Sequence, residues 1–193
     1  MNEVDKVKKL VLEESKDWEE FSRQFLRFHV KLVVDYAVRL AGMLGADKEV
    51  VAISAWLHDQ TIQTHGDKDH NVTGAKHARD VLGKIGFSEE KIRKICDSIE
   101  THRCKDGLMP KTLEAKILAS ADAMAHFDMP LFLPWIGKRR GKSLAETLQW
   151  MKDKGERDWN RKMFFPEAKE MIRHKYEMFM ELVEDHLKLL GNG

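Results

Sequence analysis

The residues best suited to metal chemistry are a histidine and an aspartate that stand side by side at positions 58 and 59. They follow the apolar stretch 55–57, so we expect them at the end of a buried helix. A carboxylate there is costly unless something neutralises its charge, and a divalent metal ion would do so. Imidazole nitrogen and carboxylate oxygen are common ligands of zinc, manganese, iron and nickel. The pair therefore predicts a metal site.

Two residues elsewhere in the chain can complete this site. Adjacent helix residues diverge by about 100°, so an ion held by both His58 and Asp59 needs further ligands from neighbouring helices. His29 lies close to an apolar helical stripe, and Asp122 lies in the stretch 119–125, which is almost wholly small and apolar. Aspartate is rarely buried without a partner. We therefore predict that these four residues bind a divalent ion together.

Helical periodicity dominates the segments that must position these residues. Apolar residues recur at spacings of three and four, and the chain has only four prolines. The fold class is therefore predicted to be all-α. We expect helices at about residues 4–14, 17–44, 47–60, 70–85, 88–104, 112–127, 143–154 and 166–190.

Several residues mark the expected ends of these helices. Gly45 is placed to end the second helix, and Asp47 and Ser88 are placed to cap the N-termini of the helices that follow them. Phe28 is expected on the apolar stripe of the second helix. Prolines and a glycine at positions 130, 134 and 137 should interrupt the helical pattern before a compact basic loop at residues 138–142.

Length and composition limit the class of protein. The 193 residues suit a single domain 1–193, with a core at about residues 20–127 and a helical C-terminal part at 128–193. The 33 basic residues nearly balance the 32 acidic ones, so there is no basic excess typical of a nucleic-acid binder, although a local basic patch stays open. No signal-peptide core and no membrane-length apolar run is present. We expect a cytoplasmic protein with no membrane contact, and a homodimer stays open.

The order of His29, His58-Asp59 and Asp122, each in its own helix, resembles the HD-domain superfamily of metal-dependent phosphohydrolases. The segments 29–41, 55–59 and 113–123 resemble the family's first-histidine helix, its Leu-His-Asp block and its final Ala-Asp block. The resemblance covers about residues 25–127 and implies an HD-type helical core. Many members have a further acid two residues before the last aspartate, where this chain has Ser120.

Two more histidines extend the resemblance. His70 and His102 stand where many members supply extra ligands, and His77, one heptad after His70, is an alternative to it. With six ligands the family often binds a second metal, bridged by the aspartate of the pair. The implied cofactor is one or two divalent ions, which could be Mn, Ni, Fe, Zn or Mg. The implied ligand set is His29, His58, Asp59, His70, His102 and Asp122.

The resemblance also implies a reaction. An HD-type site would hydrolyse a phosphate ester of a small phosphorylated metabolite, foremost a nucleotide, with a metal-activated water. Asp59, His70 and His102 are the expected catalytic residues: Asp59 would orient the water, and the histidines would contact phosphate or transfer a proton. Two alternatives stay open, a di-iron oxygenase built on the same six ligands and a non-enzymatic nucleotide-binding module.

Other polar residues have a possible role at the site and also an ordinary structural interpretation. The basic loop is a candidate phosphate clamp, through Lys138, Arg139 and Arg140, although such a loop is more often an ordinary solvated turn. His126 follows Asp122 by four residues, so it is a candidate for a supporting contact to the site. His65 lies in a polar loop, where solvation is the simpler interpretation.

Overall fold

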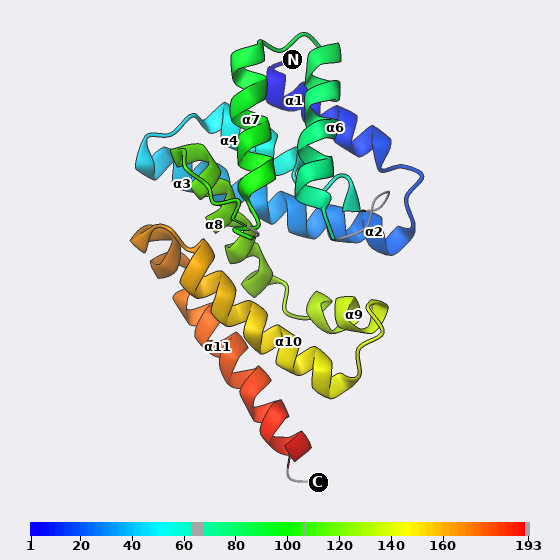
Figure 1. Cartoon of the computed structure of the whole chain (residues 1–193), viewed down its shortest axis with the longest axis vertical. Helices are drawn as coiled ribbons and strands as arrows, with labels where there is room; N and C mark the ends of the chain where they lie inside the picture. The colour runs from blue at the N-terminus through cyan, green and yellow to red at the C-terminus, as the bar shows by residue number, and fades with distance from the viewer. Residues whose placement is uncertain (63–67, 106, 192–193) are drawn as a thin grey trace. The chain divides into compact units, whose positions relative to one another are not determined.

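The computed structural model describes residues 1–62, 68–105 and 107–191. These residues form helices and no β-strand apart from an isolated bridge between Lys105 and Leu108, which confirms the all-α prediction. Figure 1 shows the helices in chain order. They are α1 (Glu3–Glu14), α2 (Glu20–Phe25), η1 (Leu26–Val30), α3 (Lys31–Leu44), α4 (Lys48–Leu57), α6 (His70–Lys84), α7 (Glu89–Thr101), α8 (Leu113–Asp128), α9 (Phe132–Arg139), α10 (Leu144–Arg157), η2 (Asp158–Lys162) and α11 (Pro166–Gly191). None of the described helices has the length and apolar character needed to cross a membrane.

The helix ends follow the predicted capping residues closely. Gly45 ends α3 in the left-handed conformation, with φ of 72°, which glycine adopts without steric cost. The Asp47 side chain accepts hydrogen bonds from the first backbone N–H groups of α4, and Ser88 does the same for α7. Since α7 ends at Thr101, His102 stands directly after the helix.

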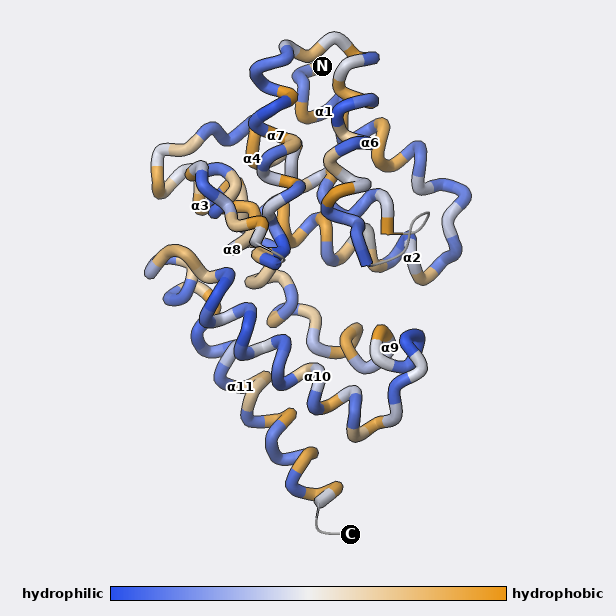
Figure 2. Tube along the Cα trace, in the orientation of Figure 1, coloured by the Kyte–Doolittle hydropathy of each residue, from blue (hydrophilic) through white to orange (hydrophobic). Residues whose placement is uncertain are grey.

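The chain divides into two compact units, Met1–Asp122 and Ala123–Gly193. In the first unit α4 is the central helix, because α1, α3 and α7 all pack against it. Every residue from Val50 to Leu57 is buried, which explains why this helix is apolar on all sides. Along much of the trace in Figure 2, hydrophobic and hydrophilic residues alternate, as in helices with one buried and one exposed face. Helices α6 and α7 form a hairpin and lie side by side in Figure 1.

A single wide helical turn carries His29. The chain passes from α2 through the π-helical turn Leu26–Val30 into α3. Such a turn inserts an extra residue and shifts the register of the side chains on either side of it. His29 is 1% exposed, whereas Phe28 is 53% exposed, so the prediction of Phe28 on the apolar stripe was wrong. The shifted register turns the histidine inward in place of the phenylalanine.

In the second unit α9, η2 and α11 pack against α10 (Figure 1). Helix α9 was not predicted, because Pro134 and Gly137 were expected to prevent it. Pro134 is the third residue of α9, where a helix has no internal partner for the backbone N–H, so the proline costs no hydrogen bond. Lys138 and Arg139 therefore lie in the last turn of a helix rather than in a loop.

Candidate metal centre

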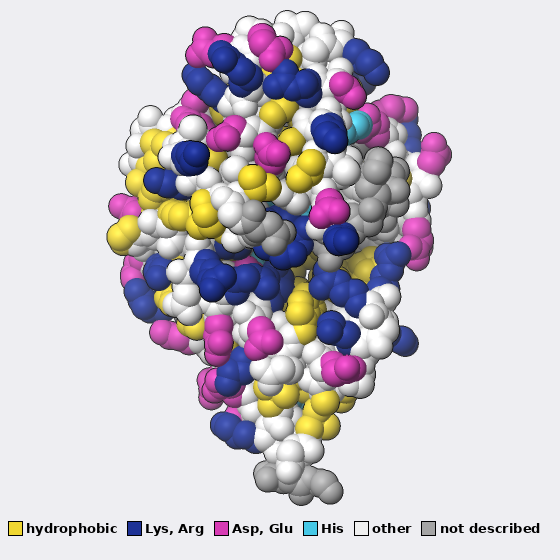
Figure 3. Space-filling model, in the orientation of Figure 1, with side chains coloured by type: hydrophobic (Ala, Val, Ile, Leu, Met, Phe, Trp, Pro, Cys, Tyr) yellow, Lys and Arg dark blue, Asp and Glu magenta, His cyan; other side chains and the backbone are white. Residues whose placement is uncertain are grey.

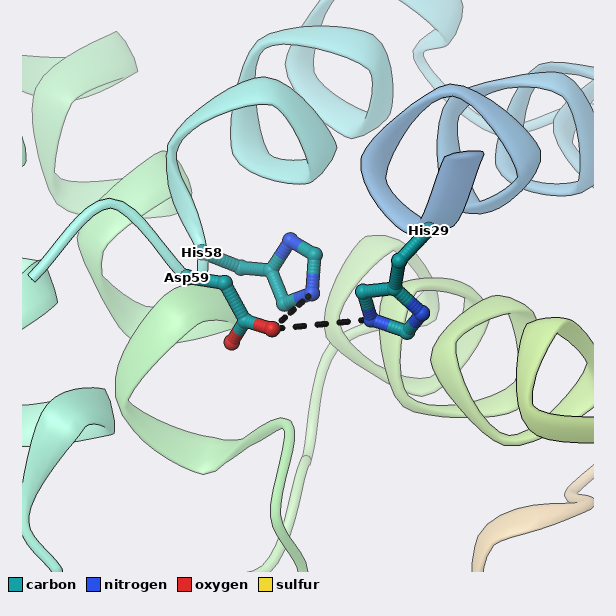
Figure 4. Close-up of side chains that lie close together, drawn as sticks. All are labelled: His29, His58 and Asp59. Carbon is teal, nitrogen blue, oxygen red and sulfur yellow. Dashed lines mark ion pairs between the residues drawn. The ribbon is translucent and has the colours of Figure 1, made fainter. Parts of the chain in front are cut away.

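The first part of the candidate site joins four of the predicted ligands, all from the first unit. His29 Nε2 lies 3.5 Å from Asp59 Oδ2, and His58 Nε2 lies 3.4 Å from the same oxygen. Figure 4 shows both rings directed toward the Asp59 carboxylate, His58 and Asp59 from the end of α4 and His29 from η1. Asp122 Oδ1 lies 3.1 Å from His29 Nε2 and 3.8 Å from His58 Nε2. We call these four residues the first half-site.

Two histidines and the same aspartate form a second group. His70 Nε2 lies 3.4 Å from Asp59 Oδ1, and His102 Nε2 lies 3.9 Å from it. The two Nε2 atoms are 3.3 Å apart. Asn71, the residue after His70, donates a hydrogen bond of 2.7 Å from Nδ2 to the carbonyl of Glu100, which ties α6 to α7 beside these histidines. We call Asp59, His70 and His102 the second half-site.

Asp59 is the residue shared by the two half-sites. Its Oδ2 faces His29 and His58, while its Oδ1 faces His70 and His102. Burial by itself raises the pKa of Asp59, but Coulombic interaction with His58, His70 and His29 outweighs burial and lowers the pKa below its usual range. The carboxylate is therefore ionised at neutral pH, as a metal ligand must be.

The backbone fixes which ring nitrogen of two histidines faces the site. His58 Nδ1 lies 2.8 Å from the carbonyl of Ala55, and His102 Nδ1 lies 2.6 Å from the carbonyl of Ile99. With its proton on Nδ1 donated to the carbonyl, each ring directs the Nε2 lone pair toward Asp59. This second hydrogen bond is characteristic of metal-binding histidines.

Burial sets the charge of His58. Complete burial lowers the pKa of His58, outweighing the nearby carboxylates of Asp59 and Asp122, which raise it. The ring is therefore neutral at pH 7. Its Nε2 atom is buried and makes no hydrogen bond. A neutral imidazole nitrogen held in this way is suited to a metal ion.

The donor set fits a divalent metal in both half-sites. Two ligands at about 2.1 Å from one ion lie roughly 3.0 Å apart when they are cis in an octahedron and about 4.2 Å apart when trans. The separations given above run from 3.1 to 3.8 Å in the first half-site and from 3.3 to 3.9 Å in the second. Within His29–His58–Asp59 and within Asp59–His70–His102, the ligand atoms all lie within 4.8 Å of one another. The spacing and chemistry of these atoms therefore suit one ion in each half-site.

Burial isolates the cluster from bulk water. His29, His58 and His102 are each no more than 2% exposed, and the Asp59 side chain is 10% exposed. On the face drawn in Figure 3, histidine contributes only small patches to the surface. Metal–ligand and metal–phosphate attraction is stronger in such a site than in water.

Of the other candidate histidines, two have acidic partners outside the two half-sites and one lies outside the described residues. His77 Nε2 lies 3.2 Å from Glu14 Oε2, with the histidine side chain 30% exposed, so the structure brings His70 and not His77 to Asp59. His126 Nδ1 lies 2.9 Å from Asp158 Oδ2 in the second unit. His65 lies outside the described residues.

The predicted phosphate clamp lies in the second unit, at the end of α9. The Arg139 guanidinium stands over the ring of Trp135 at 4.8 Å, and that of Arg140 stands over Trp150 at 4.9 Å. All three predicted clamp residues are exposed. Their role toward a substrate stays a prediction.

A comparison with protein-family models identifies the family. The HD domain model matches residues 27–126, which is more than half of the chain. The chain belongs to the HD-domain family. The matched range contains all six residues of the two half-sites.

Comparisons with individual proteins agree with an HD-domain fold. A predicted HD superfamily hydrolase from an uncultured Thermotogales bacterium is 21% identical, with a TM-score of 0.60 over 96% of this chain and 92% of that one. Bacillus subtilis YpgQ, solved in complex with ADP, is 17% identical, with a TM-score of 0.70 over 96% of this chain and 93% of that one. At these identities the likeness concerns the fold.

One curated relative matches part of the HD-domain chain in sequence. It is the tRNA (cytidine(56)-2'-O)-methyltransferase of Picrophilus torridus, 29% identical over 112 residues. The match spans 52% of this chain but only 31% of the methyltransferase, so it concerns a minor part of that protein.

Proposed function

We propose that this HD-domain protein is a metal-dependent phosphohydrolase that cleaves a phosphate ester of a small metabolite, foremost a nucleotide. The observation that carries the proposal is the Asp59 carboxylate, whose two oxygens face two separate sets of histidine nitrogens. Paired metal sites of this kind suit in-line displacement at phosphorus. The ADP bound to YpgQ, which has a similar fold, supports a nucleotide as the substrate class.

The residues of the two half-sites would have different roles in such a reaction. A bound divalent ion would polarise a phosphoryl oxygen and lower the pKa of a bound water. Asp59 is ionised, so it can accept a hydrogen bond from the attacking water and orient it. His102 donates its Nδ1 proton to the Ile99 carbonyl, which leaves the Nε2 lone pair to bind metal. His70 Nε2 lies 3.3 Å from His102 Nε2, and in a form of the site with one ion, in which His70 is not a ligand, it is the candidate to move a proton toward the leaving group.

The proposal is tested by loading purified protein with Mn²⁺, Ni²⁺, Fe²⁺, Zn²⁺ or Mg²⁺ in turn and measuring phosphate release from a panel of nucleotides and simple phosphoesters. We expect turnover of at least one nucleotide, loss of turnover with a chelator, and recovery when the metal is restored. Nucleotide binding without turnover under every metal would contradict the proposal and favour a binding module. Oxygen consumption by an iron-loaded protein that releases no phosphate would favour oxygen chemistry.

Removing the basic side chains at the end of α9 tests the predicted phosphate clamp. The triple variant Lys138→Ala, Arg139→Ala, Arg140→Ala should raise KM for a nucleotide about tenfold or more, since a hydrogen bond to a charged group contributes roughly 1.5–3 kcal/mol. We expect kcat to change much less, because these residues are not metal ligands. The control is Lys188→Ala, which removes an exposed lysine paired with Asp185 on α11. Steady-state kinetics of both variants give the KM and kcat values to compare. Equal KM values in the two variants would show that the clamp prediction is wrong.

A further inference from the structure

The contact between the His58–Thr61 turn and the first turn of α6 sets the relative position of the two half-sites. The first half-site depends on His58 and Asp59 at the start of this turn, whereas the second depends on His70 at the start of α6. Asp59 can serve both only if these two segments keep a fixed distance. The residues that join the two segments therefore affect the geometry of the second half-site.

Thr61 makes this connection with its hydroxyl group. Thr61 is 4% exposed, and its Oγ1 donates a hydrogen bond of 3.1 Å to the carbonyl of His70. The same oxygen lies 2.9 Å from Thr73 Oγ1 and can accept a hydrogen bond from it, and the Thr73 hydroxyl also lies 3.2 Å from the carbonyl of Asp69, the other acceptor within its reach. These hydroxyl contacts, of which the one between Thr61 and the His70 carbonyl is buried, hold the first turn of α6 against the end of the His58–Thr61 turn.

Gly74 allows the two segments to approach this closely. A Cβ atom at position 74 would lie 3.2 Å from the His58 carbonyl oxygen, 3.4 Å from Ile99 Cγ2 and 3.6 Å from Thr61 Oγ1. The first of these contacts is tighter than ordinary packing and involves backbone, which has little freedom to move. A side chain at position 74 would therefore push α6, and His70 with it, away from Asp59.

We propose that Thr61 and Gly74 are positioning residues that set the spacing between the two half-sites and so control occupancy of the second one. Neither residue is among the metal ligands, and each acts through the backbone of His58 or His70. The proposal rests on the two-ion form of the proposed function. It predicts that loss of the Thr61 hydroxyl weakens metal binding at Asp59–His70–His102 while the first half-site keeps its ion.

The test compares wild type, Thr61→Val and Thr61→Ser. Metal-free protein is titrated with Mn²⁺ in a calorimeter, and the metal content of the equilibrated protein is then measured. Valine has nearly the shape of threonine without the hydroxyl, and serine keeps the hydroxyl. We expect wild type and Thr61→Ser to bind two ions per chain. We expect Thr61→Val to bind the first ion normally and the second about 10- to 100-fold more weakly, the usual effect of losing a residue that supports a ligand.

The outcomes separate this proposal from the proposed function. A Thr61→Val protein that binds both ions like wild type, or that loses both equally, would overturn the positioning role. Wild type that binds a single ion and still hydrolyses nucleotides would also overturn it but would leave the phosphohydrolase proposal intact. If Thr61→Val does not fold, as judged by circular dichroism, Gly74→Ala provides the same test, with selective loss of the second ion expected.

Discussion

Replacement of Asp59 by asparagine is expected to remove metal from both half-sites and to lower phosphate release by at least about 1,000-fold. Metal catalysis contributes several kcal/mol to the transition state, and each 1.36 kcal/mol is a factor of ten in rate. Asparagine has the same shape, so the substitution removes the charge that attracts the ions while it leaves the packing in place. Metal content of the gently purified variant and its turnover under the wild-type assay are the measurements.

His77→Gln is the matched control for this experiment. His77 lies on α6 like His70, but its ring contacts Glu14 and is part of neither half-site. We expect this variant to keep its metal and its turnover within about twofold, because exposed ion pairs contribute little. An Asp59→Asn protein that retained both metal and turnover would overturn the assignment of the metal centre.

The Asp59→Asn variant should lose more bound metal than the His102→Ala variant. His102 contributes to the second half-site alone, whereas each oxygen of Asp59 faces a different half-site. His102→Ala should therefore keep metal in the first half-site. Metal content distinguishes the two variants even where both are inactive, and equal metal loss in them would argue against two separable half-sites.

The order of the ligands and the main helices could be predicted from the sequence because local signals agree with the tertiary structure. Asp47 and Ser88 are strong N-terminal caps, and Gly45 is a strong C-terminal one. The apolar stretch before His58 has no polar face, which a helix needs unless it is surrounded by others. A histidine and an aspartate at the end of such a helix therefore indicate a metal site.

The choice between His70 and His77 could not be made from the sequence. The two residues are one heptad apart on the same helix face, so periodicity treats them alike. The neighbouring helices decide between them: Glu14 of α1 faces His77, and Asp59 after α4 faces His70. Sequence patterns contain no information on which neighbour lies at which height along α6.

The wide turn at His29 was missed for a related reason. Nothing in the residues Leu26–Val30 is specific for a π-helical turn, and ordinary periodicity places Phe28 inward. The turn carries the buried His29, whose Nε2 lies beside the carboxylates of Asp59 and Asp122. Such turns are found often at functional sites, and only the tertiary contacts reveal this one.

A buried charge cluster in the second unit is the other feature that sequence patterns concealed. Positions 154, 158 and 162 are spaced like an exposed ion-pair row on a helix, yet Asp158 is fully buried and Lys162 is 4% exposed. Asp158 Oδ2 lies 3.0 Å from Lys154 Nζ and 2.9 Å from His126 Nδ1. Burial by itself raises the pKa of Asp158, but Lys154 and His126 outweigh burial and hold the pKa well below its usual range.

Asp158→Ala is therefore expected to destabilise the protein by about 3–5 kcal/mol, the usual cost of leaving a buried charge without its partner. Urea unfolding followed by circular dichroism measures the change. Asp153→Ala is the control, because Asp153 lies on α10, the helix directly before Asp158, but is exposed, with its carboxylate accepting a hydrogen bond from Gln149. A substitution at an exposed position of this kind should change the free energy of unfolding by no more than about 0.5 kcal/mol. Equal unfolding midpoints in the two variants would show that the cluster contributes little to stability.

The pH dependence of unfolding gives a second, independent measure of the same cluster. The folded-state pKa of Asp158 lies below the unfolded value of about 3.9, so its contribution to stability is present above that pH and is lost as the pH falls toward the folded value. Wild type and Asp153→Ala should both lose this part of their stability below about pH 4. Asp158→Ala lacks the titrating group, so its free energy of unfolding should fall less steeply over the same range. A slope equal to that of wild type would mean that Asp158 is not held ionised by Lys154 and His126.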